Sequence, residues 1–446
     1  MNNASRFTAG FALRPLAVAL VLGGSLTSVF ATNGMNMEGY GPISAGMGGA
    51  SQSFDNGTAA MAQNPATLGL MAEGARLDVA LGVLGPKITA SMAGMPSADS
   101  SATSFVMPAL GYARRSGALT YGVGMFAQGG MGTEYGANSF MAAGSGAPVR
   151  SELGVGKVII PVAYQATPEL TLGATFDFMW AGMDMVMAAT GAQLAGMASN
   201  PTGVLATQLP ALAGSPWVSI GFTDSDKNTG AAKATGYSAK LGGVYKVSKD
   251  VSVGGSYQFK SNLGDMKTSA GGASMAGPSG VIDTGTLTII DFQWPSVLAV
   301  GASWQASPAL MVAADLKSIG WADTMKSFRM RYDSTGMGGS VDFAMPQNWK
   351  DQTVLSLGLA WKANDKLVWR AGVNIADNPI PEDMVNPLFP ATIKSHITAG
   401  LGYEVTKNDA INVALTMAPK VSVTNASGVT TEHAQTNVQL MYSRRF

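Results

Sequence analysis

The sequence contains no cysteine, and only 13% of its 446 residues are charged. Without cysteine the chain can have neither a disulfide framework nor a thiolate metal site. Lys and Arg equal Asp and Glu at 28 each, so no excess of positive charge is available to bind nucleic acid. Soluble domains carry about 25% charged residues, so the low charge, with 56 glycines and 46% apolar residues, favours a β-rich membrane protein.

Long apolar runs are also missing. Beyond the N-terminus, no segment offers the ~18 uninterrupted apolar residues that a membrane-spanning helix needs. At the N-terminus, Arg6 and Arg14 precede a short apolar core at 16–24 and a run of small residues at 28–31. This pattern predicts a cleaved signal peptide over residues 1–31 and therefore export of the chain.

An aromatic residue recurs a few positions before a short polar turn or the chain end. The seven residues are Tyr112, Tyr164, Tyr245, Trp304, Trp361, Tyr403 and Tyr442. Amphipathic rings of this kind settle at the interface between a bilayer and water, where outer-membrane barrels carry them as girdles. We therefore predict that the seven residues form one rim of a membrane barrel.

Apolar and polar residues alternate on both sides of these turns. In 355–362, leucines and Trp361 alternate with Ser356, Gly358 and Lys362, the period-two pattern of a strand between lipid and a polar lumen. Seven turn ends close seven descending strands, which require seven ascending partners. The sequence thus predicts an all-β fold, a 14-stranded antiparallel transmembrane β-barrel over residues 75–446, with long connections at the opposite end.

A soluble β-sandwich or propeller is the alternative to this fold. It would have to place Asp315, Lys317 and Arg370 in a dry core, because these residues fall on the face opposite the aromatic rings. Unpaired buried charges are too costly for such a core. In a barrel, we expect Lys317 and Arg370 to pair with Asp315 or Glu404, although a carboxylate head group of a ligand is another candidate partner.

Residues 32–74 precede the first strand-like segment and are rich in glycine. A barrel of this size leaves a lumen wider than side chains fill, since eight strands already suffice for that. We expect these residues to form a compact hatch, or plug, inside the lumen. A disordered tail is the alternative, but Met47, Phe54 and Met61 are among several apolar residues that could pack.

The segment "SAGMGGASQSFDNGTAAMAQNPATL" resembles the N-terminal hatch of the FadL family of outer-membrane transporters. The resemblance rests on Gly46–Ala50 and on the Asn-Pro-Ala motif formed by Asn64, Pro65 and Ala66. It continues at 121–135, which is similar to the third strand of the family, and through several later segments to cover essentially the whole mature chain. Family members have fourteen strands and carry long-chain fatty acids and other hydrophobic compounds.

The resemblance implies a mechanism. Outer loops capture a hydrophobic molecule, a lumen pocket holds it, the hatch shifts, and the molecule leaves sideways at a kink in the third strand. Gly129 and Gly130 suit such a kink, because a glycine pair weakens a strand and permits a bulge; a tight loop is the alternative reading of this pair. Asn64, Pro65 and Ala66 would belong to the gate, with Asn64 capping a turn beside the gap.

Ligand-binding candidates come from three segments. Strand parity turns four methionines inward, and flexible, polarizable Met suits varied apolar ligands; a register break at Gly182 is the alternative. The outer connection at 188–232 is long and apolar, which is typical of a capture surface. The candidates are Phe54, Phe126, Met179, Met183, Met185, Met187 and Trp217.

Catalytic and cofactor signatures are weak. "GVGMFA" at 122–127 lacks a following helix and an acidic partner, so it is not a dinucleotide site. Only His396 and His433 are available for acid–base chemistry, so we expect no enzyme, no metal and no cofactor. We predict an outer-membrane channel of a Gram-negative cell for passive uptake of hydrophobic molecules. The alternatives are a porin-like channel for small polar solutes and an outer-membrane enzyme.

The expected partners follow from this location. They are hydrophobic small molecules, outer-membrane lipid and lipopolysaccharide, with no nucleic acid. The C-terminal strand ends at Phe446 with Tyr442, Leu440 and Val438 on the same side, which resembles the signal read by the barrel-assembly machinery, although Arg444 departs from the apolar alternation. We expect a monomer.

Overall fold

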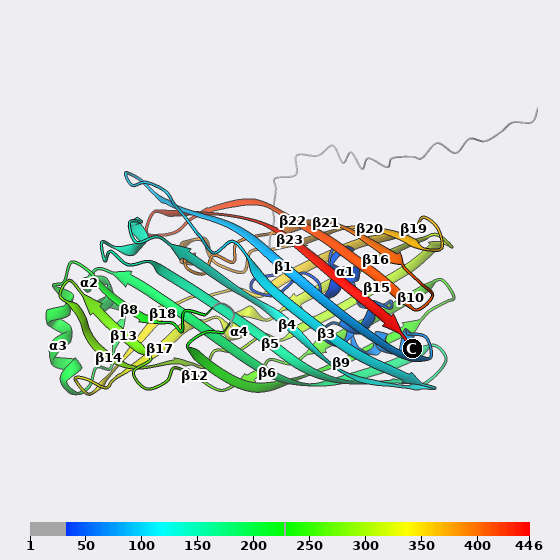
Figure 1. Cartoon of the computed structure of the whole chain (residues 1–446), viewed down its shortest axis with the longest axis horizontal. Helices are drawn as coiled ribbons and strands as arrows, with labels where there is room; N and C mark the ends of the chain where they lie inside the picture. Colours follow the sequence, from blue (N-terminus) through cyan, green and yellow to red (C-terminus); the bar gives the residue numbers. More distant parts are fainter. Residues whose placement is uncertain (1–32, 227–228) are drawn as a thin grey trace, which may run out of the picture.

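The structure is a computed structural model that describes residues 33–226 and 229–446. The expected signal peptide, residues 1–31, lies outside this part of the chain. The strands form one antiparallel sheet, and the sheet closes into a barrel because β1 (Gly74–Met92) pairs with β23 (Val429–Arg445) over residues 76–92. Figure 1 shows this closure as the blue strand beside the red one.

The path of hydrogen-bonded neighbours leads once round the barrel and returns to β1. Between β1 and β23 it passes in order through β3 (Phe105–Ser116), β4 (Leu119–Tyr135), β5 (Val149–Gln165), β6 (Leu170–Ala189), β9 (Ala232–Lys246), β10 (Val251–Gln258), β15 (Val297–Ser307), β16 (Leu310–Ile319), β19 (Gln352–Lys362), β20 (Leu367–Ala376), β21 (Ser395–Glu404) and β22 (Asp409–Thr424). Alternate connections on this path are short turns, and the others are long except for the four-residue connection 425–428 between β22 and β23.

The long connections contain strands of their own. These are β2 (Ala98–Asp99), β7 (Ala198–Ser199), β8 (Val218–Phe222), β11 (Asn262–Leu263), β12 (Met266–Lys267), β13 (Ala273–Gly277), β14 (Gly280–Ile290), β17 (Ser327–Ser334) and β18 (Ser340–Pro346). Several of them extend the wall at the end of the barrel opposite the C-terminus (Figure 1). We call this the loop end and the opposite one the turn end.

The predicted number of strands requires correction. The sequence predicted fourteen, and this number is not supported for the sheet as a whole, which contains 23 strands. The reason is that the prediction counted only strands that reach a short turn marked by an aromatic residue. Strands such as β8 and β13, which pair with each other within the outer connections, carry no such mark and were assigned to loops.

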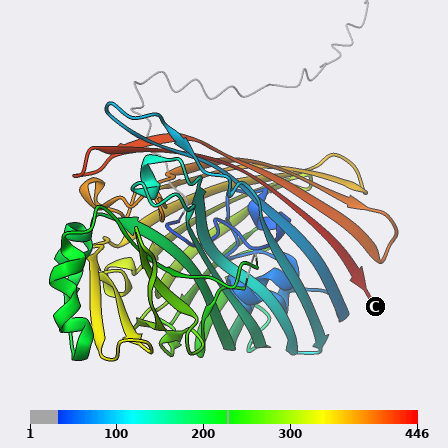
Figure 2. The same ribbon diagram turned by 60° about the vertical axis from the view of Figure 1, so that its left-hand side comes forward.

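Helices are few and short. They are α1 (Gly41–Ala45), α2 (Gly191–Met197), α3 (Gly203–Ala213), α4 (Trp321–Thr324) and the 3₁₀ helices η1 (Gly57–Ala62), η2 (Pro65–Leu70), η3 (Phe140–Ala142) and η4 (Glu382–Met384). In residues 33–226 and 229–446, none of the helices is both long and apolar enough to cross a membrane. Figure 2 shows α3 at the loop end and α1 among the strands.

The outer face of the barrel is apolar, as the alternation predicted. Leu172, Phe176 and Phe178 on β6 are about half exposed, whereas their neighbours Thr175 and Asp177 are buried. All seven rim aromatics are exposed, by 37% to 56%, and all lie near the turn end. Exposed apolar side chains around a closed barrel form the band that faces lipid.

Residues 33–73, here called the N-terminal segment, lie inside the barrel (Figure 2). Between Asn33 and Leu70, Asp55 is the one exposed residue. Inward polar groups of the wall hold the segment: the Asp315 carboxylate accepts hydrogen bonds from the backbone N–H groups of Ser51 (2.6 Å) and Gln52 (3.1 Å). Asn374 donates to the Gly48 carbonyl at 3.0 Å. The inward polar face thus supplies partners for a backbone that makes little regular structure of its own.

A large apolar cluster fills the loop half of the barrel. It includes Met179, Met183 and Met185 from β6 together with Phe222 of β8 and Trp321 of α4. This cluster and the N-terminal segment occupy most of the lumen. One of the remaining cavities lies where the two meet, near β4.

Candidate functional site

β4 is irregular in its middle. Its pairing with β5 shifts register between Ala127 and Gly129, which is a β-bulge. Its pairing with β3 ends at Phe126, which lies opposite Ala109. Beyond Phe126, β4 therefore has no pairing with β3, and the next contact on that side is the Ser101 N–H, which donates to the Glu134 carbonyl at 2.8 Å. The wall thus has a gap between β3 and β4 on the loop side of Phe126.

The N-terminal segment pairs with β4 at this bulge from inside the barrel. The N–H of Gly130 donates to the Met35 carbonyl at 3.2 Å, and the N–H of Met37 donates to the Gln128 carbonyl at 3.3 Å. This approach requires glycine at 129, since a Cβ there would lie 2.0 Å from the Met35 carbonyl oxygen. Residues 35–37 thus act as a short extra strand on part of the edge that β3 leaves unpaired.

Tyr40 fixes the same contact. Its hydroxyl donates to the Gln128 carbonyl at 3.0 Å. Burial raises the pKa of Tyr40, and the charge of Glu38 raises it further, so the hydroxyl keeps its proton and remains a donor. The bulge of β4 therefore has three hydrogen bonds to the N-terminal segment.

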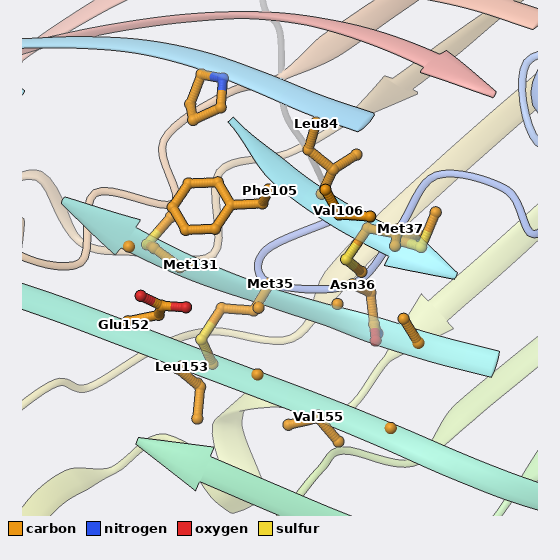
Figure 3. Close-up of a pocket in the computed structure, with 18 of the residues that line it drawn as sticks. Met35, Asn36, Met37, Leu84, Phe105, Val106, Met131, Glu152, Leu153 and Val155 are labelled. Carbon is orange, nitrogen blue, oxygen red and sulfur yellow. The ribbon is translucent and has the colours of Figure 1, made fainter. Parts of the chain in front are cut away.

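A cavity of about 270 Å³ lies at the gap. From inside the barrel it is lined by Met35, Leu153 and Val155, all at most 4% exposed. From outside it is lined by Val106 and Met125, which are 44% and 37% exposed. The cavity therefore reaches both faces of the barrel wall, and Figure 3 shows the lining residues between the strands that border it.

Polar groups in this cavity are few. They include Asn36, Glu152, His433 and Gln435. The Glu152 carboxylate accepts from Arg150 at 2.9 Å, and the Nδ1 of His433 lies 2.8 Å from the Pro390 carbonyl oxygen. A mostly apolar lining with a few polar groups is typical of a site for a small organic ligand.

A second, smaller cavity of about 60 Å³ shares Asn36 and Met37 with the first. Three lysines line it: Lys157, Lys240 and Lys317. Lys157 forms a buried ion pair with Asp177 at 3.0 Å, and Lys240 donates to the Ala62 carbonyl. Their nitrogens are thus engaged in holding the wall and the N-terminal segment together.

The lumen cations do not make the hydrogen bonds expected from the sequence. Lys317 donates to the Gly49 carbonyl at 2.9 Å, and Arg370 donates to Asn412 at 3.0 Å. Asp315 instead accepts from the N-terminal segment, and Glu404 pairs with Arg445 at 2.9 Å. The prediction was wrong because the sequence does not show that backbone groups of a lumen segment compete for these charges.

The predicted gating residues separate into two places. Gly129 and Gly130 line the larger cavity. Asn64 caps η2, as expected, by accepting from the N–H of Ala66 at 3.1 Å. However, its amide donates to the Gly243 carbonyl of β9 at 3.0 Å, so Asn64, Pro65 and Ala66 lie against β6 and β9 and not beside the gap. The residues that do adjoin the gap are 35–37.

The predicted ligand-binding residues do not line the larger cavity. Met179, Met183 and Met185 face inward as predicted, and Met187, which is half-buried, packs against the same apolar cluster. Phe126 packs with Met61, and Phe54 packs with Met47. Trp217 is half-buried just before β8. These residues belong to the packed regions on either side of the cavity.

Few features of the sequence indicated which residues line the larger cavity. Met35 and Asn36 lie at the start of the segment that was expected to be a hatch, where nothing distinguishes them from the other residues. Leu153 and Val155 alternate with Gly154 and Gly156. This run of glycines at every second position was a usable signal, because glycine inside a strand marks a close approach or an open space.

Comparisons with known proteins agree with this architecture. A family model described as outer membrane protein transport protein (OMPP1/FadL/TodX) matches residues 18–444. The chain is 31% identical to the P. putida toluene transporter TodX, with a TM-score of 0.82 over 92% of this chain and 99% of that chain. It is also 31% identical to the Ralstonia pickettii toluene transporter TbuX, with a TM-score of 0.77 and the same coverage.

One curated relative matches over a shorter stretch. An uncharacterized Chlorobium limicola protein, described by its position in the 5' region of the phosphoenolpyruvate carboxykinase gene, is 40% identical over 115 residues. The match covers 25% of this chain and 55% of that protein. The chain thus spans about half the length of this relative.

Proposed function

Because the chain belongs to the outer membrane transport protein family OMPP1/FadL/TodX, we propose that it admits small hydrophobic molecules passively through the outer membrane. The protein is located in the outer membrane of a Gram-negative cell, in agreement with its family and with its exposed apolar belt. We also propose that it works as a monomer, inserted by the barrel-assembly machinery through β23 and surrounded by lipid and lipopolysaccharide.

The observation that carries the proposal is the cavity at the β4 gap. Its lining combines inward residues such as Leu153 with outward residues such as Val106. A ligand would leave through this gap sideways, between β3 and β4, and enter the membrane directly. Lateral exit spares an apolar molecule the loss of about 25 cal/mol per Å² that it would suffer in periplasmic water.

The size of the cavity favours a compact ligand. Its volume of about 270 Å³ exceeds the ~150 Å³ of an engineered protein cavity that binds benzene. It lies just below the range of about 300–1,000 Å³ that is usual for small-molecule sites. We propose monoaromatic hydrocarbons as the preferred class, in line with the toluene transporters TodX and TbuX. Long-chain fatty acids are the second candidate, because they are ligands of the wider family that the sequence resembles.

Residues 35–37 would form the moving part of the gate. They make the hydrogen bonds to β4 that cover the gap from inside, and Tyr40 adds one more. A small shift of this stretch would connect the lumen to the gap. The remainder of the N-terminal segment, including Asn64–Ala66, would stay fixed as a hatch by its contacts with β6, β9 and the inward polar groups.

The outer connection that carries α2 and α3 would capture the ligand. α3 has the exposed apolar residue Val204 and the half-buried Leu209 and Leu212 at the loop end. Capture there would hand the molecule to the methionine-rich cluster formed by Met179, Met183, Met185 and Met187. Met side chains adapt to varied apolar shapes, so the cluster would yield locally as a ligand moves toward the gap.

A porin-like channel for small polar solutes is the second candidate. The N-terminal segment and the apolar cluster fill the lumen, and the smaller cavity measures only about 60 Å³, which disfavours it. An enzyme is the third candidate. His396 and His433 are at most 2% exposed, and family membership favours transport over catalysis.

Uptake measurements test the proposal. Cells that lack the gene should take up radiolabelled toluene more slowly at limiting concentration, and plasmid-borne wild-type chain should restore the rate. Purified protein in liposomes should admit no glucose in a swelling assay. Glucose entry without any effect on toluene uptake would support the porin reading and refute ours. Replacing both histidines by glutamine should leave uptake unchanged, whereas loss of a hydrolytic activity would indicate an enzyme.

A further inference from the structure

The outer face of the wall beside the gap is hollowed by glycines. Gly154 and Gly156 alternate on β5 with the inward residues Leu153 and Val155, and they share the parity of Ile160, which is 52% exposed. Gly182 lies opposite Gly154 on β6, and no register shift interrupts the pairing of these two strands. All three glycines therefore face the membrane side.

Larger groups border this row of glycines. The indole of Trp180 lies against Gly156, where an added Cβ would be 2.2 Å from Cζ2. The carbonyl of Thr229 lies against Gly182, with a corresponding distance of 1.8 Å. Between them, Gly154 has no heavy atom within 4 Å of the position of an added Cβ. The result is a groove with Gly154 as its open floor.

The groove is continuous with the cavity at the gap. Gly154, Gly156, Trp180 and Gly182 line the same 270 Å³ space as Met35 and Gly129. A molecule that passes the β4 bulge therefore reaches the groove without crossing a barrier of side chains. This continuity connects the groove to the path from the lumen and not to the surrounding lipid alone.

Charged side chains mark one end of the groove. Glu152 lines it on the loop side of Gly154. Arg150 lies 2.9 Å from the Glu152 carboxylate and 3.4 Å from that of buried Asp184. These charged groups make the loop side of the groove polar, whereas its floor at Gly154 is apolar.

We propose that this groove, floored by Gly154, Gly156 and Gly182 and flanked by Trp180, is a binding site on the outer face that receives the hydrophobic ligand as it leaves the gap. The proposal rests on the lateral exit proposed above. In this site the missing side chain at Gly154 leaves room for a flat apolar molecule against the Trp180 ring, which lies over Gly156 and offers an aromatic contact. The ligand then moves from this groove into the bilayer.

Filling the groove tests the inference. Gly154→Leu places a side chain in open space, and the backbone at 154 does not have a positive φ, so the barrel should fold. We expect initial uptake of radiolabelled toluene by cells to fall about tenfold, because the added side chain occupies the space that the ligand would take. Gly243→Leu is the matched control, since Gly243 faces the membrane side on β9 with its nearest neighbour, Leu172 Cδ2, at 3.7 Å.

A second form of the test avoids any doubt about folding. The chain has no cysteine, so Gly154→Cys and Gly243→Cys each carry a single thiol. Treatment with benzyl methanethiosulfonate should lower toluene uptake for the first and not for the second, and in each case the protein has folded before the reagent is added.

The outcomes separate the inference from the proposed function. Unchanged uptake by Gly154→Leu and by labelled Gly154→Cys would overturn the groove and leave toluene transport intact. Unchanged uptake together with loss of a co-purifying lipid from Gly154→Leu would assign the groove to an acyl chain instead. Wild-type uptake no faster than that of cells without the gene would refute the transport function itself.

Discussion

Replacing Gly129 by alanine is expected to release residues 35–37 from β4. The new Cβ would lie 2.0 Å from the Met35 carbonyl oxygen and 3.3 Å from the Asn36 Cα, distances that the backbone contact cannot accommodate. The segment must therefore move away from the bulge, and both backbone hydrogen bonds, at 3.2 Å and 3.3 Å, are lost with it.

The size of the effect follows from these two bonds. Each contributes about 0.5–1.5 kcal/mol net, so together they hold the segment in place by about 1–3 kcal/mol. A change of that size shifts an equilibrium between docked and released states by about 5- to 150-fold.

Thiol labelling measures this equilibrium. Met37→Cys provides a single thiol in a chain without cysteine, and a maleimide should react with it about 5 to 150 times faster when Gly129→Ala is also present. Gly117→Ala is the control, because Gly117 has a φ of +60° in an exposed turn with no atom within 4 Å. Equal labelling rates with and without Gly129→Ala, or an equal increase in the Gly117→Ala control, would refute the role assigned to this contact.

Three further changes test the wall and the hatch. Lys157→Met should lower the free energy of unfolding by about 3–5 kcal/mol, since it leaves the carboxylate of Asp177, 1% exposed at the side chain, without its ion-pair partner. Thermal melting should show that the double variant Lys157→Met/Asp177→Asn regains stability. A double variant no more stable than Lys157→Met would contradict the pairing. Phe176→Arg in the lipid-facing belt should lower the free energy of unfolding by up to about 2–4 kcal/mol, measured by urea titration in vesicles. Val281→Arg, at a position 68% exposed on β14, should leave this free energy unchanged. Equal losses for the two variants would show that the lipid-facing belt is not where we place it. Asn64→Ala should cost about 1–2 kcal/mol through the lost cap of η2 and slow the regain of native mobility on gels during refolding, and an unchanged stability would argue against a fixed hatch.

Much of the barrel could be predicted because the residue patterns that determine its strands are local in the sequence. The alternation of Leu172, Phe176 and Phe178 with polar neighbours reports which face meets lipid, and each rim aromatic lies next to a turn that is visible in the sequence. The extra strands at the loop end escaped prediction for the opposite reason. β8 and β13 are held by pairing between segments about 55 residues apart in the chain, and short strands of this kind have no strong local pattern.

The site depended on contacts that no local pattern contains. The sequence marked Gly129 and Gly130 as a weak point, but which stretch of the hatch meets them is decided by tertiary packing. The Asn-Pro-Ala motif was expected there and lies against β9 instead, because Asn64 finds a carbonyl at Gly243. Met35–Met37 carry no motif, since their role uses backbone groups that every residue has.

The packing of the N-terminal segment across the lumen has an electrical consequence. Between Asn33 and Leu70 only Asp55 is exposed, and wall residues such as Asp315 and Asn374 bind the backbone of this segment. We therefore expect no continuous water column from one rim to the other. We predict that such a barrel is an insulator and that planar bilayer recordings show a flat baseline at applied voltages. A cell could therefore display many copies without making its surface leaky to salts or to hydrophilic antibiotics.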